Sequence, residues 1–126
     1  MRVVRLTAPG DLENLKLIEE DHPKPRPHEL LVRIRAASLN FHDDMVVHGK
    51  IPSADGRIPI SDGAGEVLAV GDDVDEFEVA DNVVSTFWSC WLGGEMTPAT
   101  KRDMPGESVD GYAREYVCMP DRKSVV

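Results

Sequence analysis

The stretch ELLVRIRAAS, residues 29–38, has the clearest strand pattern in the sequence. Its alternate positions form two sets, one of Leu31, Arg33 and Arg35 and one of Leu30, Val32, Ile34 and Ala36. A period of two residues places such sets on opposite faces of an extended chain. The stretch therefore predicts a β-strand with one face buried and the other toward solvent.

Shorter strands are predicted on both sides of this one. They cover residues 2–6, 15–19, 66–70, 82–87 and 111–120, separated by turns rich in Gly, Pro and Asp. Prolines at every second position of residues 22–27 predict an extended connector, because proline cannot donate a hydrogen bond to a sheet. About six short strands without alternating helices favour a mainly β protein, with a closed or partly closed β-barrel, over a nucleotide-binding α/β sheet.

One short helix is predicted within NFHDDMVVHG, residues 40–49. Asn40 is a typical N-cap, and Asp43 and Asp44 fall in the first turn, where negative charge suits the helix dipole. Gly49 follows as a common end of a helix. Because the stretch also contains two histidines, its polar groups could serve as acid and base catalysts or as metal ligands.

Length and charge narrow the class of protein. A chain of 126 residues corresponds to one domain, and no run approaches the ~20 apolar residues that span a bilayer. The N-terminus lacks the apolar core and cleavage site of a secretion signal, so we expect a cytoplasmic protein that does not enter a membrane. The 14 basic residues are scattered among 23 acidic ones, and the net charge of −9 disfavours nucleic acid as a partner.

The two cysteines do not form a recognisable framework. Cys90 and Cys118 have 27 residues between them, which is too sparse for a disulfide scaffold and lacks the paired spacing of a structural zinc site. We expect both thiols to be reduced and packed.

Two glycines imitate a nucleotide-binding motif. Gly63 and Gly65 match the start of G-x-G-x-x-G, but the third position holds Leu68 and the segment enters a strand instead of a helix. We expect a tight turn before a strand, in which glycine allows a positive φ or close backbone packing.

A metal site would need three or four converging ligands. The candidate side chains are His42, His48, Asp43, Asp44, Asp62 and Glu66. Asp44 and His48 are four residues apart, which is also the spacing of an ion pair on a helix surface. Because no cysteine or further histidine is clustered with them, we predict no bound metal. No serine lies in a nucleophile elbow, so a Ser-His-Asp triad is not predicted either.

Residues 88–110 form a 23-residue segment with three glycines, two prolines and little periodicity. Structureless loops longer than about 12 to 15 residues are uncommon in compact domains and are often functional. We expect this segment to contribute to a site. Its Trp88 and Trp91 would either line the substrate side or pack the loop.

Four motifs carry a family resemblance. They are SLNFHDDMVVHG (38–49), PISDGAGEVLAVGDDVDEF (59–77), NVVSTF (82–87) and DGYAREYVCMP (110–120). In order and approximate spacing they resemble the N-terminal half of the medium-chain dehydrogenases/reductases, the superfamily of alcohol dehydrogenases and quinone oxidoreductases. The resemblance implies a GroES-like catalytic domain over residues 1–126, a partly open β-barrel with one or two short helices.

The differences from the family pattern concern zinc. Zinc-dependent members carry a cysteine at the position of Asn40 and Gly-His-Glu at residues 60–62, which here are Ile-Ser-Asp. They also carry a four-cysteine lobe where residues 88–110 contain Cys90 alone. The resemblance therefore implies the zinc-independent branch, without metal ligands. Ala80 stands where the family often has glycine, which predicts reduced local stability.

The resemblance also implies a function. Family members continue into a Rossmann domain that binds NADP or NAD, and this domain is absent from the chain. The chain would be the catalytic-domain portion of an NAD(P)H-dependent oxidoreductase that acts on a small-molecule carbonyl, alcohol or quinone/enone substrate. By itself it would be inactive and would not bind the cofactor tightly. A homodimer is expected for the complete form.

Three residues would carry that function. By resemblance, Asn40 and Asp43 lie beside the nicotinamide end of the cofactor, and His42 replaces the hydroxyl residue that starts the proton relay of zinc enzymes. His42 and Asp43 are therefore the catalytic candidates, and Asn40 and Asp43 the cofactor-binding ones. Alternatively, His42 is an exposed first-turn residue and Asn40 only a cap. For the whole chain, a non-enzymatic GroES-like module or a non-functional truncated remnant remains open.

Overall fold

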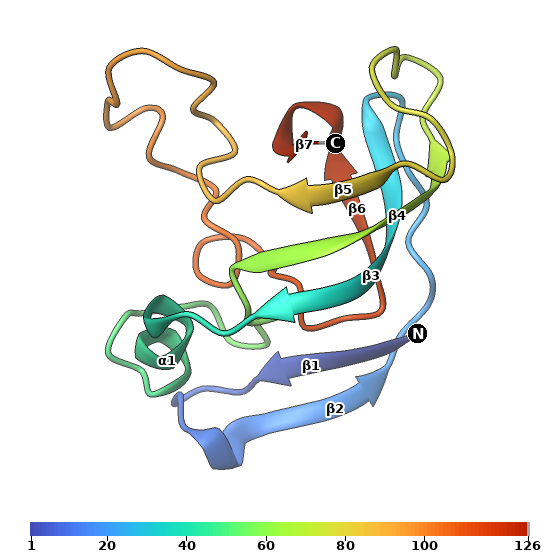
Figure 1. Cartoon of the computed structure of the whole chain (residues 1–126). Coiled ribbons are helices and arrows are strands. Elements are labelled where there is room, and N and C mark those ends of the chain that lie inside the picture. The colour runs from blue at the N-terminus through green and yellow to red at the C-terminus, as the bar shows by residue number, and fades with distance from the viewer. Residues whose placement is uncertain (126) are drawn as a thin grey trace.

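The computed structural model describes residues 1–125, and its strands form two antiparallel sheets (Figure 1). The smaller sheet pairs β1 (Arg2–Leu6) with β2 (Leu15–Glu19). The larger has the order β6-β3-β4-β5-β7 and consists of β3 (Glu29–Ser38), β4 (Asp62–Val70), β5 (Asn82–Ser85), β6 (Tyr116–Pro120) and β7 (Ser124–Val125). The helical elements are α1 (Phe41–Val47) and the 3-10 turns η1 (Leu12–Asn14) and η2 (Asp121–Lys123). The prediction of a mainly β fold is confirmed. No helix within residues 1–125 is long and apolar enough to cross a membrane.

The strand predicted at residues 29–38 is the centre of the larger sheet, with β4 on one side and β6 on the other. Leu30 and Val32 are 0% and 1% exposed, whereas Arg33 and Arg35 are exposed, as the alternation predicts. The other buried members of this core are Val67, Val83, Tyr112, Val117 and Met119. Since a fully buried aliphatic side chain contributes about 1.5–3 kcal/mol, this cluster is a main source of stability. The last residues of β3, 36–38, are exposed and lead to the start of α1.

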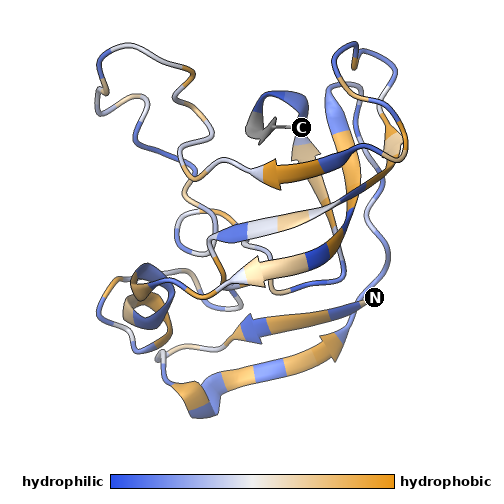
Figure 2. Ribbon diagram, viewed as in Figure 1, coloured by the Kyte–Doolittle hydropathy of each residue, from blue (hydrophilic) through white to orange (hydrophobic). Residues whose placement is uncertain are grey.

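The hairpin of β1 and β2 packs beside the larger sheet and α1 (Figure 1). Leu6 of β1 is 2% exposed and packs against Val46 and Val47 of α1. Figure 2 shows this apolar stripe of α1 together with the apolar positions along both sheets. The hairpin therefore buries one side of the helix and fixes its direction.

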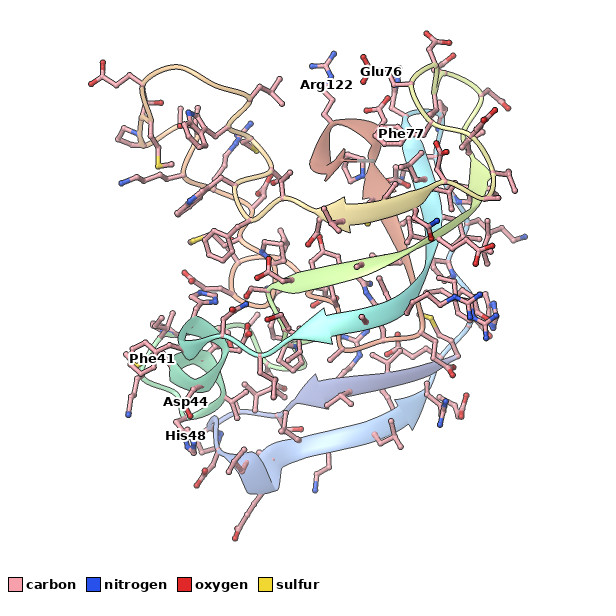
Figure 3. The ribbon with its side chains drawn as sticks, viewed as in Figure 1. Phe41, Asp44, His48, Glu76, Phe77 and Arg122 are labelled. Carbon is pink, nitrogen blue, oxygen red and sulfur yellow. The ribbon has the colours of Figure 1, made fainter. Side chains whose placement is uncertain are left out.

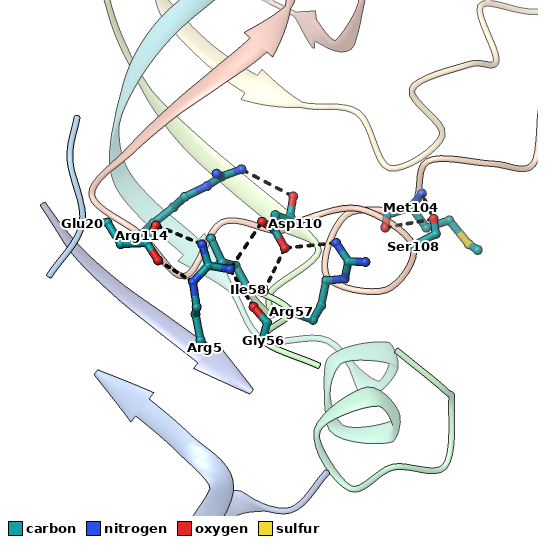
Figure 4. A network of polar contacts seen from close by, with 9 residues as sticks. All are labelled: Arg5, Glu20, Gly56, Arg57, Ile58, Met104, Ser108, Asp110 and Arg114. Atoms are coloured by element: carbon teal, nitrogen blue, oxygen red, sulfur yellow. Dashed lines mark hydrogen bonds and ion pairs between the residues drawn. The ribbon is translucent and has the colours of Figure 1, made fainter. Parts of the chain in front are cut away.

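A network of charged side chains also holds the hairpin (Figure 4). The guanidinium of Arg5 donates through Nη2 to Glu20 Oε2 at 2.9 Å, and its Nη1 lies 3.7 Å from Asp110 Oδ2. Asp110 Oδ1 accepts from Arg57 Nη1 at 3.0 Å and from the backbone N–H of Ile58 at 3.1 Å. The network links β1 and β2 to the segments before β4 and β6.

The turn predicted at Gly63 and Gly65 is wrong, because both residues lie inside β4, which begins at Asp62. A Cβ atom at Gly65 would lie 2.1 Å from the carbonyl oxygen of Arg33, and one at Gly63 would lie 2.7 Å from the ring of Tyr112. Close packing, the other half of the expectation, therefore requires glycine at both positions, against backbone at Gly65 and against an aromatic ring at Gly63.

Two other predicted strands were too long. β5 ends at Ser85 instead of residue 87, and β6 begins at Tyr116 instead of residue 111. Residues 111 and 112 donate instead to the segment before β4, with Gly111 N–H bonded to Ile58 O at 2.7 Å. The sequence of residues 111–115 continues into β6 without a turn signal, so the alternation alone does not mark where the strand begins.

Ala80 has φ +78°, in the left-handed region that favours glycine. Its N–H donates to Val67 O at 2.9 Å, so the turn before β5 holds this conformation in place. This geometry explains why a glycine would suit the position. Both cysteines are free and half-buried, and burial raises the pKa of the Cys118 thiol.

Candidate active site

The candidate site is built at the start of α1, directly after β3. Asn40 is the N-cap of this helix, as predicted. The carboxylate of Asp43 accepts hydrogen bonds from the backbone N–H of Asn40 at 2.9 Å and of Ser61 at 2.8 Å. Asp43 is only 4% exposed, and these two donors compensate its buried charge. Asp43 therefore ties the helix start to the segment that enters β4.

The side chain of Asn40 points to the same segment. Its Nδ2 donates to Asp62 Oδ2 at 2.6 Å and to Ser61 Oγ at 3.2 Å. Because an ionised carboxylate can only accept, the atom of Asn40 that faces Asp62 must be the amide nitrogen. Among the three residues at the expected ligand positions of zinc enzymes, Asn40 is thus hydrogen-bonded to both of the others.

This set does not fit a catalytic zinc ion. Zinc is held by thiolate, imidazole or carboxylate ligands, and here only Asp62 offers one. Asn40 presents N–H donors to its neighbours, and Ser61 presents a neutral hydroxyl that is 1% exposed. Across residues 1–125, no three His, Cys, Asp or Glu side chains are grouped so that they could hold a metal.

His42, the proposed proton donor, lies in the first turn of α1 and is paired. Its Nε2 is 2.6 Å from Glu107 Oε2, and the two side chains are 20% and 19% exposed. The ring also meets the ring of Phe87 edge-on, with centroids 5.3 Å apart and an interplanar angle of 89°. Nδ1 is buried, and in the described part of the chain it has no hydrogen-bond partner. The exposed first-turn residue of the alternative interpretation is therefore not what the structure contains.

Two hollows adjoin the helix start. One has a volume of about 300 Å³ and is lined by Ser38 and Asp62 together with small residues: Ala36, Ala37, Gly63, Ala64, Val84 and Ser85. The ring of Tyr112 packs against Gly63 below it, and burial raises the pKa of this phenol. The other hollow, of about 370 Å³, is mostly apolar and includes Asn40 and Asp43 in its wall. Polar groups and open space for a small molecule thus meet at Asn40.

The remaining predicted ligand candidates serve surface ion pairs. His48 Nε2 lies 3.3 Å from Asp44 Oδ1 and its Nδ1 lies 3.3 Å from Asp11 Oδ1, as the helical spacing predicted for the first pair (Figure 3). Glu66 Oε2 accepts from Arg35 Nη2 at 2.8 Å on the exposed face of the sheet. These side chains do not contact the hydrogen-bonded set of Asn40, Ser61 and Asp62, which we call the Asn40 group.

Glu107 is the functional candidate that the sequence did not single out. It lies in the long segment of residues 88–110, which length alone marked as functional, three residues before the motif that starts at Asp110. No local pattern distinguishes it from Glu95 of the same segment, because its contact with His42 spans 65 residues of sequence. Only the tertiary fold identifies it.

Comparisons with known proteins agree with the fold. The family model of the alcohol dehydrogenase GroES-like domain matches residues 26–126. A zinc-type alcohol dehydrogenase-like protein of Schizosaccharomyces pombe is 37% identical over 111 residues, which cover 86% of this chain and 32% of that protein. Among solved structures, an NAD-dependent alcohol dehydrogenase has a TM-score of 0.86 at 31% identity, covering 99% of this chain and 39% of that one.

A quinone oxidoreductase of Pseudomonas syringae is also similar, with a TM-score of 0.73 at 26% identity over 98% of this chain and 32% of that one. The chain thus spans about a third of the length of the relatives that it matches.

Proposed function

This chain belongs to the family of alcohol dehydrogenase GroES-like domains, and on that premise we propose that it is the catalytic-domain portion of a zinc-independent, NAD(P)H-dependent oxidoreductase. Family membership and the similar structures confirm the GroES-like fold that the motifs predicted. The proposed substrates are a carbonyl, an alcohol, or a quinone or enone. A non-enzymatic module and a non-functional remnant receive no support from any contact described above.

One observation carries the zinc-independent part of the proposal. The 2.6 Å hydrogen bond from Asn40 Nδ2 to Asp62 Oδ2 occupies the carboxylate that would be the remaining ligand. A zinc ion would have to displace this bond and would still lack soft ligands. The similarity to a zinc-type relative argues the other way, so this chain's own donor atoms must decide.

In the proposed site the chain supplies position and a proton, while the nicotinamide supplies the hydride when bound. We assign the nicotinamide end to the surroundings of Asn40 and Asp43. Both carboxylate oxygens of Asp43 accept from backbone N–H groups, so its proposed role is to hold Asn40 and Ser61 in place. His42 is the proposed proton donor, because it is the imidazole at this helix start, and imidazole is the side chain that most often transfers protons in acid–base catalysis.

The chain offers little to the rest of the cofactor. Gly63 and Gly65 lie within β4 and not at a helix N-terminus, so residues 63–65 form no cradle for a pyrophosphate. Two or three hydrogen bonds at about 1 kcal/mol each barely offset the cost of immobilising a ligand. We therefore propose that the isolated chain binds NADPH or NADH only weakly and turns over no substrate. A cytoplasmic location and a homodimer in complete form stay predictions.

Elemental analysis of the dialysed chain tests the metal part. We expect essentially no zinc, and a triple variant, Asn40→Cys with Ser61→His and Asp62→Glu, is the matched control that should gain about one zinc per chain. Stoichiometric zinc in the unaltered chain would contradict the proposal. For the cofactor, titration with NADPH followed by tryptophan fluorescence should give a dissociation constant near millimolar or weaker, and low-micromolar binding would reveal a nucleotide site elsewhere.

A further inference from the structure

We infer that Glu107 is a positioning residue that holds the imidazole of His42 in one orientation at the start of α1. Its catalytic meaning rests on the proposed function, in which His42 exchanges a proton with the substrate. The contact itself is a property of this chain and can be tested without cofactor or substrate.

The bond between the two side chains is short and shielded. Oε2 of Glu107 and Nε2 of His42 are 2.6 Å apart, and about four fifths of each side chain is buried. An ionised carboxylate only accepts, so the shared proton belongs to Nε2. Bonds of this kind between an ionised group and an N–H are shorter and stronger than neutral ones. Within residues 1–125, no other side chain bonds to Glu107, so the carboxylate has no competing partner.

If the ring of His42 turned away from Glu107, it would also lose its contact with the ring of Phe87. Phe87 meets it edge-on, and Nδ1 faces Asp43 Oδ1 at 3.8 Å, too far for a hydrogen bond. Phe87 directly precedes the long segment of residues 88–110, and Glu107 lies three residues before its end. Both ends of that segment therefore meet at the ring of His42.

The turn that carries Glu107 packs on the segment that precedes β4. Gly106 adopts φ +80° and its N–H donates to Val109 O at 2.9 Å, while the N–H of Glu107 donates to Met104 O at 3.2 Å. A Cβ atom at Gly106 would come within 3.1 Å of the backbone nitrogen of Ile60, which directly precedes Ser61. The carboxylate is thus presented from a tight turn that packs on the same backbone as the Asn40 group. A rigid support of this kind preorganises a reacting side chain.

Nuclear magnetic resonance of the ¹⁵N-labelled 126-residue chain tests the inference. We expect a protected proton on Nε2 of His42, shifted downfield of those of the other three histidines and identified by its loss in His42→Asn. Glu107→Ala should remove this resonance and the ring contact between His42 and Phe87. Glu107→Gln keeps the side-chain length and one acceptor oxygen, so it should keep the ring contact but lose the downfield shift.

Glu95→Gln is the matched control, since it makes the same change of charge in the same segment and should leave both signals in place. If Glu107→Ala does not fold, the isosteric Gln variant still decides between loss and retention of the downfield proton. An unaltered His42 signal in a folded Glu107 variant would overturn the inference, as would absence of the protected proton in the unaltered chain. Zinc found in the chain would overturn the proposed function and leave this resonance where it is, so the two failures are distinguishable.

Discussion

Asn40 Nδ2 lies 2.6 Å from Asp62 Oδ2, so the helix cap and the first residue of β4 are joined where zinc-dependent relatives are expected to place a metal. The amide nitrogen of Asn40 bonds to Ser61 and Asp62 at once, so it joins the start of α1 to the segment that enters β4. The site is therefore closed by hydrogen bonds within the chain, and its stability depends on the nitrogen of one side chain.

Asn40→Asp is expected to destabilise the chain. The substitution replaces a donor with a second carboxylate facing Asp62, so a partly buried hydrogen bond is lost and two like charges meet. We expect the free energy of unfolding to fall by about 1–3 kcal/mol, measured by urea denaturation at neutral pH. Asn82→Asp, the same change at an exposed position of β5, is the control; it places a carboxylate opposite Glu66 but breaks no hydrogen bond to Asp62, so it should cost less, no more than about 1 kcal/mol. Equal effects would show that the Asn40–Asp62 bond contributes nothing special.

Asp43→Asn separates support from direct catalysis at this residue. The amide can accept through one oxygen only, so one of the two backbone N–H groups now bonded to Asp43 would face another donor. We expect a loss of about 1–3 kcal/mol in the free energy of unfolding, without any substrate present. Asp44→Asn removes an exposed ion pair to His48 on the same helix and should cost no more than about 1 kcal/mol. A fully stable Asp43→Asn variant would contradict the supporting role.

Ala80→Gly is expected to stabilise the chain. Ala80 has φ +78°, and a left-handed conformation costs an L-residue with a Cβ atom roughly 1–2 kcal/mol. Glycine removes this strain but adds backbone freedom to the unfolded chain, so the net gain should be several tenths of a kcal/mol to about 1 kcal/mol. The control is Ala69→Gly inside β4, where glycine should instead cost about 0.5–1 kcal/mol. A lower melting temperature for Ala80→Gly would refute the strain at this turn.

The pair of Arg5 and Glu20 predicts part of the acid sensitivity. The hydrogen bond that Arg5 donates to Glu20 holds the pKa of this carboxyl group below the usual 4.5. A carboxyl group with a lowered pKa in the folded state contributes stability above its unfolded pKa, and that contribution disappears as the pH falls through the folded value. Stability should therefore decline below pH 4.5, and Glu20→Gln should flatten this part of the decline. Urea midpoints between pH 3 and pH 7 measure it, with Glu13→Gln as the exposed control. An unchanged acid limb in Glu20→Gln would show that the network of Figure 4 does not couple to pH through this residue.

The sequence determined those features in which each residue acts on its neighbours in the chain. Alternation at residues 29–38 gave the central strand with the observed bounds, and the N-cap with its acidic first turn gave α1. The order and spacing of the four motifs also led to the family to which the chain belongs, because both can be read directly from the sequence. The same local view failed where a strand or turn is decided by contact with another segment, as at Gly63 and Gly65, whose small size serves neighbours across the sheet.

Only the tertiary structure decided how the candidate site is assembled. Asn40 and Asp62 are 22 residues apart in sequence and His42 and Glu107 are 65 apart, so no periodicity or spacing relates them. Their pairing depends on the register of β3 with β4 and on the turn that packs Gly106 against Ile60. Polar side chains find specific partners only when the apolar core has fixed the backbone that carries them, because hydrogen bonds are directional and short while burial of apolar surface is not. Local sequence therefore specified the strands and the helix, and the packing between them specified which nitrogen meets which carboxylate.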